Sequence, residues 1–480
     1  MVEKRKKLMG SLRLVVKGEF ISLRKVQEPN TKRIKVQKKT LIKIVLFAFV
    51  FAVFVPLQFS FSGLVVTLHQ LILIAAFVPC IILYCITLYK KKRDWVIADI
   101  TITLYSLWVS MSIVYVHGLD NQIFTIAFHI VNTLGCYLFG RMLVRDKDMF
   151  VFLMRALVFL VILSIPFAVY ENLHSIRIIN SYFANYGLMI DGGNSQNIGL
   201  RLGFHRAMLT FDHAILYGVV CSIVTGVAIY IVSTSWKGRI LATVAIGISV
   251  GTSISSAAIL SYLIQVVLSI VRPAIQKMAE RVGYLKISLM IIALCLVVYY
   301  FVGFNLEKAV TSVSISDQTA VYRLYIYKYG FIEVVNNPLF GIGFNDWVRP
   351  SAMTDSIDSF WLFNAMRYGI PAFLLIVITF VIPILLFFKR TKGDHENLIS
   401  VYTLGLIGAT VALGTVHFWG AAYAFIILFL SSGMFLFRLS DSGIEEKPGR
   451  RSGCASGREH KVGKSSRKKC VSRHRKYKYK

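Results

Sequence analysis

The sequence lacks the short motifs that identify nucleotide-driven or hydrolytic enzymes. It contains no P-loop, no H-E-x-x-H, no G-x-S-x-G and no cysteine–histidine pair. The glycines of PLFGIGF, at 338–344, do not form a dinucleotide-binding fingerprint, because no strand precedes them and no acidic residue follows at the required distance. ATP-driven transport and hydrolase chemistry of these kinds therefore have no support in the chain.

Cysteine and acidic side chains are both scarce. Of seven cysteines, five lie in apolar runs and two in the basic C-terminal segment, and their spacing predicts neither a disulfide framework nor a zinc site. A metal cluster of Cys454, His460, Cys470 and His474 is disfavoured. We expect no cleavable signal peptide, because the polar segment 1–40 precedes the first apolar run.

Acidic residues number 24 against 54 Lys and Arg, which gives a formal net charge of +30. A charge of this size can indicate a nucleic-acid partner, but here the cations concentrate in two tails and in short connections between apolar runs. That distribution is typical of anchoring to anionic lipid headgroups. We therefore expect a lipid bilayer as partner and no nucleic acid.

Apolar residues make up 56% of the chain, and the mean hydropathy is +0.64. A helix needs about 20 apolar residues to cross the hydrocarbon core of a bilayer. Runs of this length recur, and they predict an all-α polytopic membrane protein of about twelve transmembrane helices. The predicted spans are 41–57, 64–88, 95–116, 122–143, 150–170, 213–233, 239–252, 254–271, 285–304, 369–389, 399–415 and 417–437.

Lysine and arginine positions predict the orientation of these spans. The basic segment 1–40 belongs in the cytoplasm, and with an even number of spans the basic segment 438–480 falls there too. Basic connections such as Lys90–Arg93, Arg141–Lys147 and Lys237–Arg239 then all lie inside. We expect the C-terminal tail to be disordered and to anchor at the membrane surface. Binding of an acidic partner is the alternative for that tail.

Two segments within the predicted membrane domain 41–437 are left on the outer side, about 171–212 and 305–358. Both carry cations on the side where topology predicts few. The second belongs to a long polar stretch at 321–371, which we expect to form a large extracytoplasmic loop.

The outer cations are candidates for binding diphosphate. Arginine presents a planar fork of donors that matches phosphate oxygens. Alternatively, these side chains reach lipid phosphates or pair with nearby acids. The strongest candidates are Arg206 and Arg323, with Arg201 and Lys328 as helpers.

Three acids and a histidine lie at predicted membrane boundaries. Asp358 is the first candidate for a general base toward a hydroxyl group, followed by His213 and Asp355. Helix capping is the alternative for Asp355 and Asp358, and for Asp212 beside His213. A further set of aromatic residues is suited either to stacking on sugar rings or to anchoring at the interface; it comprises Trp347, Trp361 and Tyr368.

Two motifs resemble those of the bacterial family of O-antigen ligases and O-antigen or exopolysaccharide polymerases. RAMLTFDHAILYG at 206–218 is similar to that family's Arg…Phe…His-Pro pattern, carried by Arg206, Phe211 and His213, with Ala214 in place of proline. VYRLYIYKYGFIEVVNNPLFGIGF at 321–344 is similar to its Arg…Asn-Pro-Leu-Phe-Gly-x-Gly pattern. In a third block, Asp358 stands where the ligases carry histidine, and this favours a polymerase.

The resemblance, which covers roughly 195–390, implies a GT-C-type glycosyltransferase of the bacterial inner membrane, with both termini cytoplasmic. It implies a glycan on undecaprenyl diphosphate as donor and an inverting, metal-independent reaction without cofactor at the periplasmic face. A chain-length regulator is a further partner in such systems. A ligase that transfers glycan to lipid A core is the alternative within the family. A polysaccharide transporter or flippase is the alternative of another class.

Overall fold

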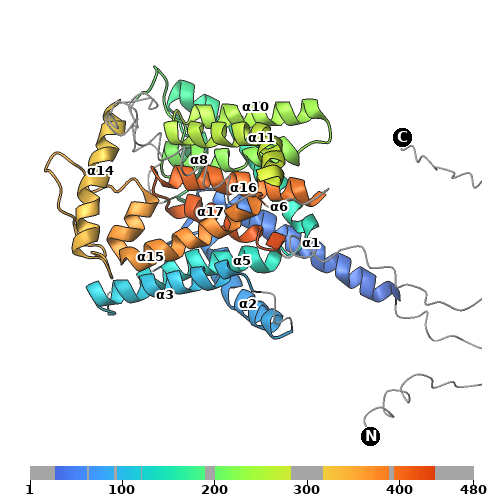
Figure 1. Ribbon diagram of the computed structural model, residues 1–480, viewed down its shortest axis with the longest axis horizontal. Helices are drawn as coiled ribbons and strands as arrows, with labels where there is room; N and C mark the ends of the chain where they lie inside the picture. Colours follow the sequence, from blue (N-terminus) through green and yellow to red (C-terminus); the bar gives the residue numbers. More distant parts are fainter. Residues whose placement is uncertain are drawn as a thin grey trace, which may run out of the picture.

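The computed structural model describes residues 28–61, 64–90, 95–120, 122–189, 200–282, 317–388 and 394–437. The predicted ninth span at 285–304, the tails 1–27 and 438–480, and the cysteines and histidines of the C-terminal segment lie outside these residues. The long helices run side by side as a bundle, and one helix, α14 (Asp317–Asn336), crosses the end of that bundle (Figure 1).

Most helices in the first half of the bundle overlap the predicted spans. The helices of this half are α1 (Glu28–Val53), α2 (Leu68–Lys90), α3 (Ile97–His117), α4 (Ile123–Ile130), α5 (Cys136–Leu143), α6 (Lys147–His174) and the short α7 (Ile178–Asn185). However, α1 begins well before its predicted span, and α7 lies in the predicted outer segment 171–212. A single π-helical turn, Val131–Gly135, joins α4 to α5, so that one continuous helix covers Ile123–Leu143.

The second half mixes short helices with long ones. They are α8 (Ala214–Ile223), α9 (Thr225–Tyr230), α10 (Trp236–Thr252), α11 (Ser256–Val282), α15 (Phe360–Ile384), α16 (Asp394–Leu413) and α17 (Gly420–Ser432), with a 3-10 turn at Leu385–Phe388. The break between α10 and α11 confirms that the stretch around 252–256 separates two helices.

Seven helices among the described residues are long and apolar enough to cross a membrane. They are Leu68–Lys90, Ile97–His117, Ile123–Leu143, Lys147–His174, Ser256–Met278, Phe360–Ile384 and His395–Leu413, and two shorter apolar helices cover Ala214–Tyr230 and Gly420–Ser432. The protein is therefore a helical protein built for a membrane. The number of twelve spans stays a prediction.

A small β-hairpin interrupts the helices where none was predicted. Strands β1 (Gln58–Phe61) and β2 (Leu64–Thr67) pair antiparallel, with Gln58 opposite Thr67. The backbone N–H of Gln58 also donates to the carbonyl oxygen of Leu188. Residues 64–67, the start of the predicted second span, are therefore strand. An apolar run alone does not tell a short strand from the start of a helix.

The predicted basic connection at 141–147 also differs from the structure. Arg141 lies inside α5 with 1% of its side chain exposed, and its Nε is 3.0 Å from Oδ1 of Asp99 on α3. The hydroxyl of Tyr137 donates to the same carboxylate at 2.6 Å. Arg141 therefore serves a buried ion pair, because a charge in the bundle is retained only when a partner and hydrogen bonds satisfy it.

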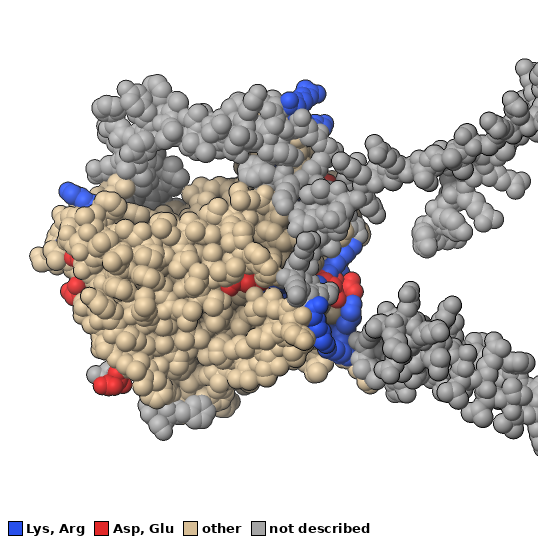
Figure 2. Space-filling model, turned by 60° about the horizontal axis from the view of Figure 1, so that its bottom comes forward, with Lys and Arg blue, Asp and Glu red and all other residues tan. Residues whose placement is uncertain are grey.

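Charge divides the surface of the bundle by position. Most of the visible face carries neither acid nor base, and Lys and Arg gather at the end from which α1 extends (Figure 2). At that end Lys39 pairs with Asp146 and Asp148 at 3.3 and 3.1 Å. We call it the basic end, and we call the opposite end, which α14 crosses, the α14 end (Figure 1).

Candidate functional site

The candidate site lies at the α14 end and begins with the segment 200–213, which is held by the end of α6. Both carboxylate oxygens of the buried Glu171 accept backbone hydrogen bonds, from Met208 at 3.0 Å and from Leu209 at 2.9 Å. Arg177 donates to the carbonyl oxygens of Leu209 and Phe211, each at 2.9 Å. These bonds hold Leu209 at a left-handed φ of 51°, which a leucine rarely adopts.

This clamp fixes two arginines. Arg206 is 5% exposed and its Nε donates to the carbonyl oxygen of Ser253, while its Nη2 is buried with no hydrogen-bond partner among the described residues. Arg201 donates to the carbonyl oxygen of Ile254 at 3.4 Å and to Oγ1 of Thr319 on α14 at 3.2 Å. In the described part of the chain, neither guanidinium has a carboxylate partner.

The third arginine comes from α14. Arg323 lies 3.6 Å from Asp358, measured from Nε to Oδ2, and its side chain is 14% exposed. Burial, followed by repulsion from Arg201 and Arg323, lowers the pKa of Arg206 to about 9. Burial and the nearby Arg323 also lower the pKa of Arg201. We call Arg201, Arg206 and Arg323 the arginine cluster.

His213 lies beside this cluster and caps α8. Its Nδ1 accepts the backbone N–H of Ile215 at 3.1 Å. Because that backbone group can only donate, the neutral ring carries its own hydrogen on Nε2. Burial, then the charge of Arg206, lowers the pKa of His213 to about 4, although Asp358 acts in the opposite direction. His213 is therefore a neutral hydrogen-bond donor near pH 7 and has no free lone pair with which to act as a base.

Asp358 does not cap α15, although its position before that helix suggested this role. Ser359 is the N-cap of α15, and its side chain accepts the backbone N–H of Leu362. Asp358 instead has one carboxylate oxygen toward Arg323 and accepts a 2.7 Å hydrogen bond from the hydroxyl of Ser356 on the other. The carboxylate is 30% exposed, so a hydroxyl group of a bound molecule has access to it.

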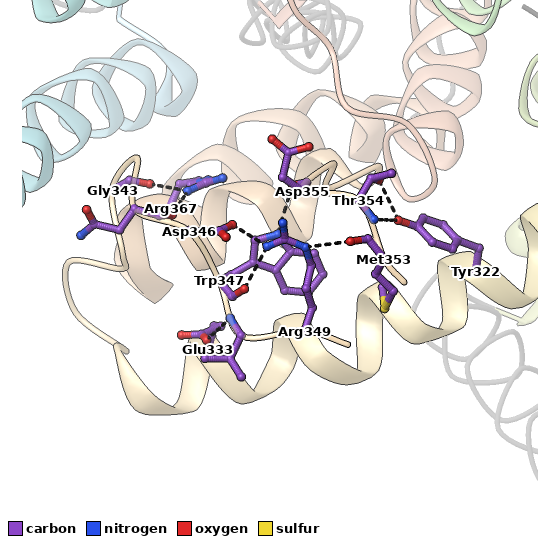
Figure 3. Close-up of polar contacts among 12 residues, drawn as sticks. Tyr322, Glu333, Gly343, Asp346, Trp347, Arg349, Met353, Thr354, Asp355 and Arg367 are labelled. Carbon is purple, nitrogen blue, oxygen red and sulfur yellow. Dashed lines mark hydrogen bonds and ion pairs between the residues drawn. The ribbon is translucent and has the colours of Figure 1, made fainter. Parts of the chain in front are cut away.

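The predicted large loop is mostly built structure. Residues 317–336 form α14, and 337–359 fold over it as a compact cap (Figure 3) that shares a small hydrophobic core with α14 and α15. In this cap Arg349 lies over the ring of Trp347 at 5.3 Å and pairs with Asp346, and Trp347 Nε1 donates to the carbonyl oxygen of Asp355. The carboxylate of Asp355 points away from these contacts (Figure 3).

The glycine-rich PLFGIGF segment, at the start of this cap, packs against α15. The backbone N–H groups of Ile342 and Gly343 donate to the carbonyl oxygens of Met366 and Arg367. In the other direction, the N–H of Ile370 donates to the carbonyl oxygen of Pro338. The backbone groups of α15 are available for this pairing because the helix breaks at Gly369, where φ is +84°. A Cβ at Gly369 would overlap the carbonyl oxygen of Leu339. The glycines therefore allow two backbone segments to approach closely. This structural role is consistent with their mismatch to a dinucleotide-binding fingerprint.

A cavity of about 390 Å³ adjoins the site. Its walls come from three segments that are far apart in sequence: the start of α8, the cap with the first turns of α15, and the connection between α16 and α17. His213, Asp355 and Asp358 line it, together with Arg367, His417 and Trp419. The structure therefore brings the predicted acids and His213 together around one hollow.

Sequence reasoning did not single out His417. It lies outside α17, in the connection 414–419, rather than in a span as the predicted boundary 417–437 had it. The argument that selected His213, a histidine at the start of an apolar run, applies equally to His417 and would have found it. Arg367, which lies in the predicted polar stretch 321–371, was not assigned a role either.

The remaining candidates lie apart from the arginine cluster. Lys328 is exposed on α14 with its ammonium 5.6 Å from the ring centre of Tyr329, and no contact described here joins it to the cluster. Trp347 is 3% exposed and Tyr368 8%. The indole N–H of Trp361 donates to the carbonyl oxygen of Thr410 at 3.3 Å. These aromatic rings pack into the protein, whereas Trp419, at 42% exposed, faces the cavity.

Comparison with known proteins does not identify the family of this chain. No protein-family model matches the chain, and no curated protein matches it. Within the described residues, no three His, Cys, Asp or Glu side chains gather as ligands of one metal ion would.

Proposed function

We propose that the protein is a membrane glycosyltransferase that polymerises oligosaccharide repeat units carried on undecaprenyl diphosphate, at the face of the membrane where the α14 end lies. The observation that carries this proposal is the arginine cluster. Three guanidinium groups from two separate segments lie close enough to repel one another, and Asp358 is the only carboxylate paired with any of them in the described residues. Such a concentration of positive charge suits a diphosphate.

The chemistry follows from the charges. A hydroxyl group of the acceptor sugar attacks the anomeric carbon of the donor glycan and gives its proton to Asp358. The bond from that carbon to the diphosphate oxygen breaks, and the oxygen leaves with the electron pair. Positive groups already in place stabilise the charge that develops on the leaving diphosphate. Attack opposite the leaving group inverts the anomeric centre.

His213 has a donor role in this reaction. Its Nε2–H can hydrogen-bond an oxygen of the glycan or the diphosphate, while Nδ1 is committed to the cap of α8. That leaves Asp358 as the general base, with Asp355 lining the same cavity. A positioned base contributes about 100- to 10,000-fold in rate.

The test uses Arg206→Gln and Arg323→Gln in proteoliposomes supplied with lipid-linked repeat units. We expect each variant to lose about 100- to 1000-fold in the rate of polymer formation, the usual effect of removing one such donor. Single repeat units should persist in cells that carry either variant. Arg155→Gln is the matched control, because Arg155 is exposed on α6 and donates only to the carbonyl oxygen of Ile231 among the contacts described.

Stability separates a lost function from a lost fold. Removing one of three mutually repelling cations relieves repulsion, so the melting temperature of Arg206→Gln in detergent should stay at or above that of the native protein. Normal chain length in both variants would rule the proposal out. Polymer that forms but never reaches its acceptor in a knockout would indicate a ligase, and transport into vesicles without a new glycosidic bond would indicate a flippase.

A further inference from the structure

The cavity beside Asp358 has a wall that the diphosphate chemistry does not use. The connection between α16 and α17, residues 414–419, contributes His417 and Trp419 to it. The backbone N–H of Phe360 donates to the carbonyl oxygen of Val416 at 3.2 Å, and Tyr327 on α14 donates to the carbonyl oxygen of Gly414. These bonds attach the connection to both elements that hold Asp358 and Arg323.

His417 is held rigidly, yet it has an unused polar atom. Its ring stacks on Phe363 with centroids 3.8 Å apart, and it also faces Phe360 and Trp419 at 6.1 and 5.8 Å. Its Nδ1 is buried and makes no hydrogen bond with the described residues. A buried polar atom without a partner is costly, and a site that binds a polar ligand supplies the missing bond.

Trp419 adds an open aromatic face to the same wall. It is 42% exposed, whereas the other aromatic rings of this wall are packed. The cavity therefore combines an aromatic surface with hydrogen-bonding groups, and its size of about 390 Å³ lies in the range of small-molecule sites. An aromatic surface beside hydrogen-bonding groups suits a sugar ring, which has one apolar face and a rim of hydroxyl groups.

The cavity and the arginine cluster lie on two sides of Asp358. One carboxylate oxygen faces Arg323 of the cluster, and the residue itself lines the cavity. A sugar in the cavity would present a hydroxyl to that carboxylate while the diphosphate lies at the arginines. Arg367, also in the wall, donates to the carbonyl oxygens of Gly343 and Asn345 and so braces the cap over the cavity.

We propose that residues 415–419 form the binding site of the acceptor glycan. His417 is a positioning residue that hydrogen-bonds a ring hydroxyl of the acceptor, and Trp419 is the surface on which the sugar ring stacks. This inference rests on the proposed function and adds to it the place of the second substrate.

The direct test is binding of a repeat-unit oligosaccharide released from its lipid carrier by mild acid, so that it has no diphosphate. Saturation-transfer NMR or calorimetry on the full-length protein in detergent measures the affinity. His417→Phe keeps the stacked ring but has no nitrogen, and we expect it to weaken binding about tenfold, the effect of one lost hydrogen bond. Trp419→Ala should weaken binding at least as much, and His417→Gln should recover part of the loss.

Kinetics distinguish this inference from the proposed function. His417→Phe and Trp419→Ala should raise the KM for the acceptor. They should leave unchanged the slow hydrolysis of the donor, in which water replaces the acceptor and polyprenyl diphosphate leaves, whereas Arg206→Gln should abolish that hydrolysis. Trp236→Ala is the control, because Trp236 is 68% exposed at the start of α10 and does not line the cavity. Native oligosaccharide affinity in both His417→Phe and Trp419→Ala overturns the acceptor site, even if Arg206→Gln is inactive.

Discussion

At the scale of the residue, two histidines line the cavity and both are kept neutral. Burial and the nearby arginines lower the pKa of His213 to about 4. Burial and Arg367 lower the pKa of His417 to about 3. Histidine ordinarily has a pKa near 6.5, so the pKa values of both rings lie below the physiological pH range. In the proposed function, neutral rings would let the cavity accept a glycan without competing with the arginine cluster for the diphosphate.

We therefore predict that kcat/KM shows no histidine titration between pH 5.5 and 8. Stability should behave differently, because between about pH 4 and 6.5 the unfolded chain binds protons that the folded protein does not. Folded-state stability then falls as the pH is lowered through this range. Melting curves should show a smaller acid-induced decrease for His213→Asn, which retains a good helix cap. An activity limb near pH 6.5 that disappears in His213→Asn would contradict this account.

Several site residues could be predicted one by one, because their chemistry is unusual for their place. Arginines outside the expected basic connections led to Arg201, Arg206 and Arg323, and the structure places all three together. The same reasoning chose Lys328, which is wrongly placed for the cluster: five residues from Arg323 along a helix, it faces about 140° away. Periodicity would have shown this only if residues 317–336 had been expected as a helix.

At the scale of the element, the break in α15 organises the α14 end. Gly369 lets the chain turn between two helical pieces, and the PLFGIGF segment pairs with the carbonyl groups that the break exposes. Ser112 on α3 donates to the carbonyl oxygen of Phe340 in the same segment. The sequence showed the glycines but not their partner, because backbone pairing between residues so far apart in the chain leaves no periodic signal.

Gly369→Ala should therefore damage both fold and activity. A left-handed φ costs an L-residue about 1–2 kcal/mol, and the new Cβ meets the Leu339 backbone, which cannot move aside cheaply. We expect a clear decrease in melting temperature in detergent and a loss of polymer formation. Gly251→Ala is the matched control: a Cβ at this α10 position meets nothing within 4 Å, so alanine should be neutral or slightly stabilising. Equal melting temperatures for the two variants would disprove the role of the break.

The elements that sequence reasoning missed share a physical cause. The hairpin β1–β2 and helix α14 are both short or polar, and tertiary contacts stabilise them. One hairpin strand bonds to Leu188, and α14 packs on the cap core with Ile326 and Val334. Long apolar helices are predictable because the bilayer imposes their length and composition. Elements outside that constraint are decided by neighbours that a linear reading does not supply.

At the scale of the whole molecule, charge and chemistry occupy opposite ends. The basic end carries Lys39 and the surrounding cations, and the α14 end carries the arginine cluster and the cavity. Each segment of the site is a connection at the same end of successive helices: 200–213 before α8, 253–255 between α10 and α11, and 414–419 between α16 and α17. This alternation is what a chain that crosses a membrane repeatedly would produce.

Orientation then becomes a measurable property of two surface positions. Lysine and arginine favour the cytoplasmic side, so the basic end should lie there and the α14 end outside. In a background without the native cysteines, we expect Val348→Cys, at a position 77% exposed in the cap, to react with a membrane-impermeant maleimide on intact spheroplasts. Lys237→Cys, in the exposed turn that begins α10, should react only after permeabilisation. If both positions label from the same side, the α14 end and the basic end cannot face opposite sides of the bilayer, and the predicted topology is wrong.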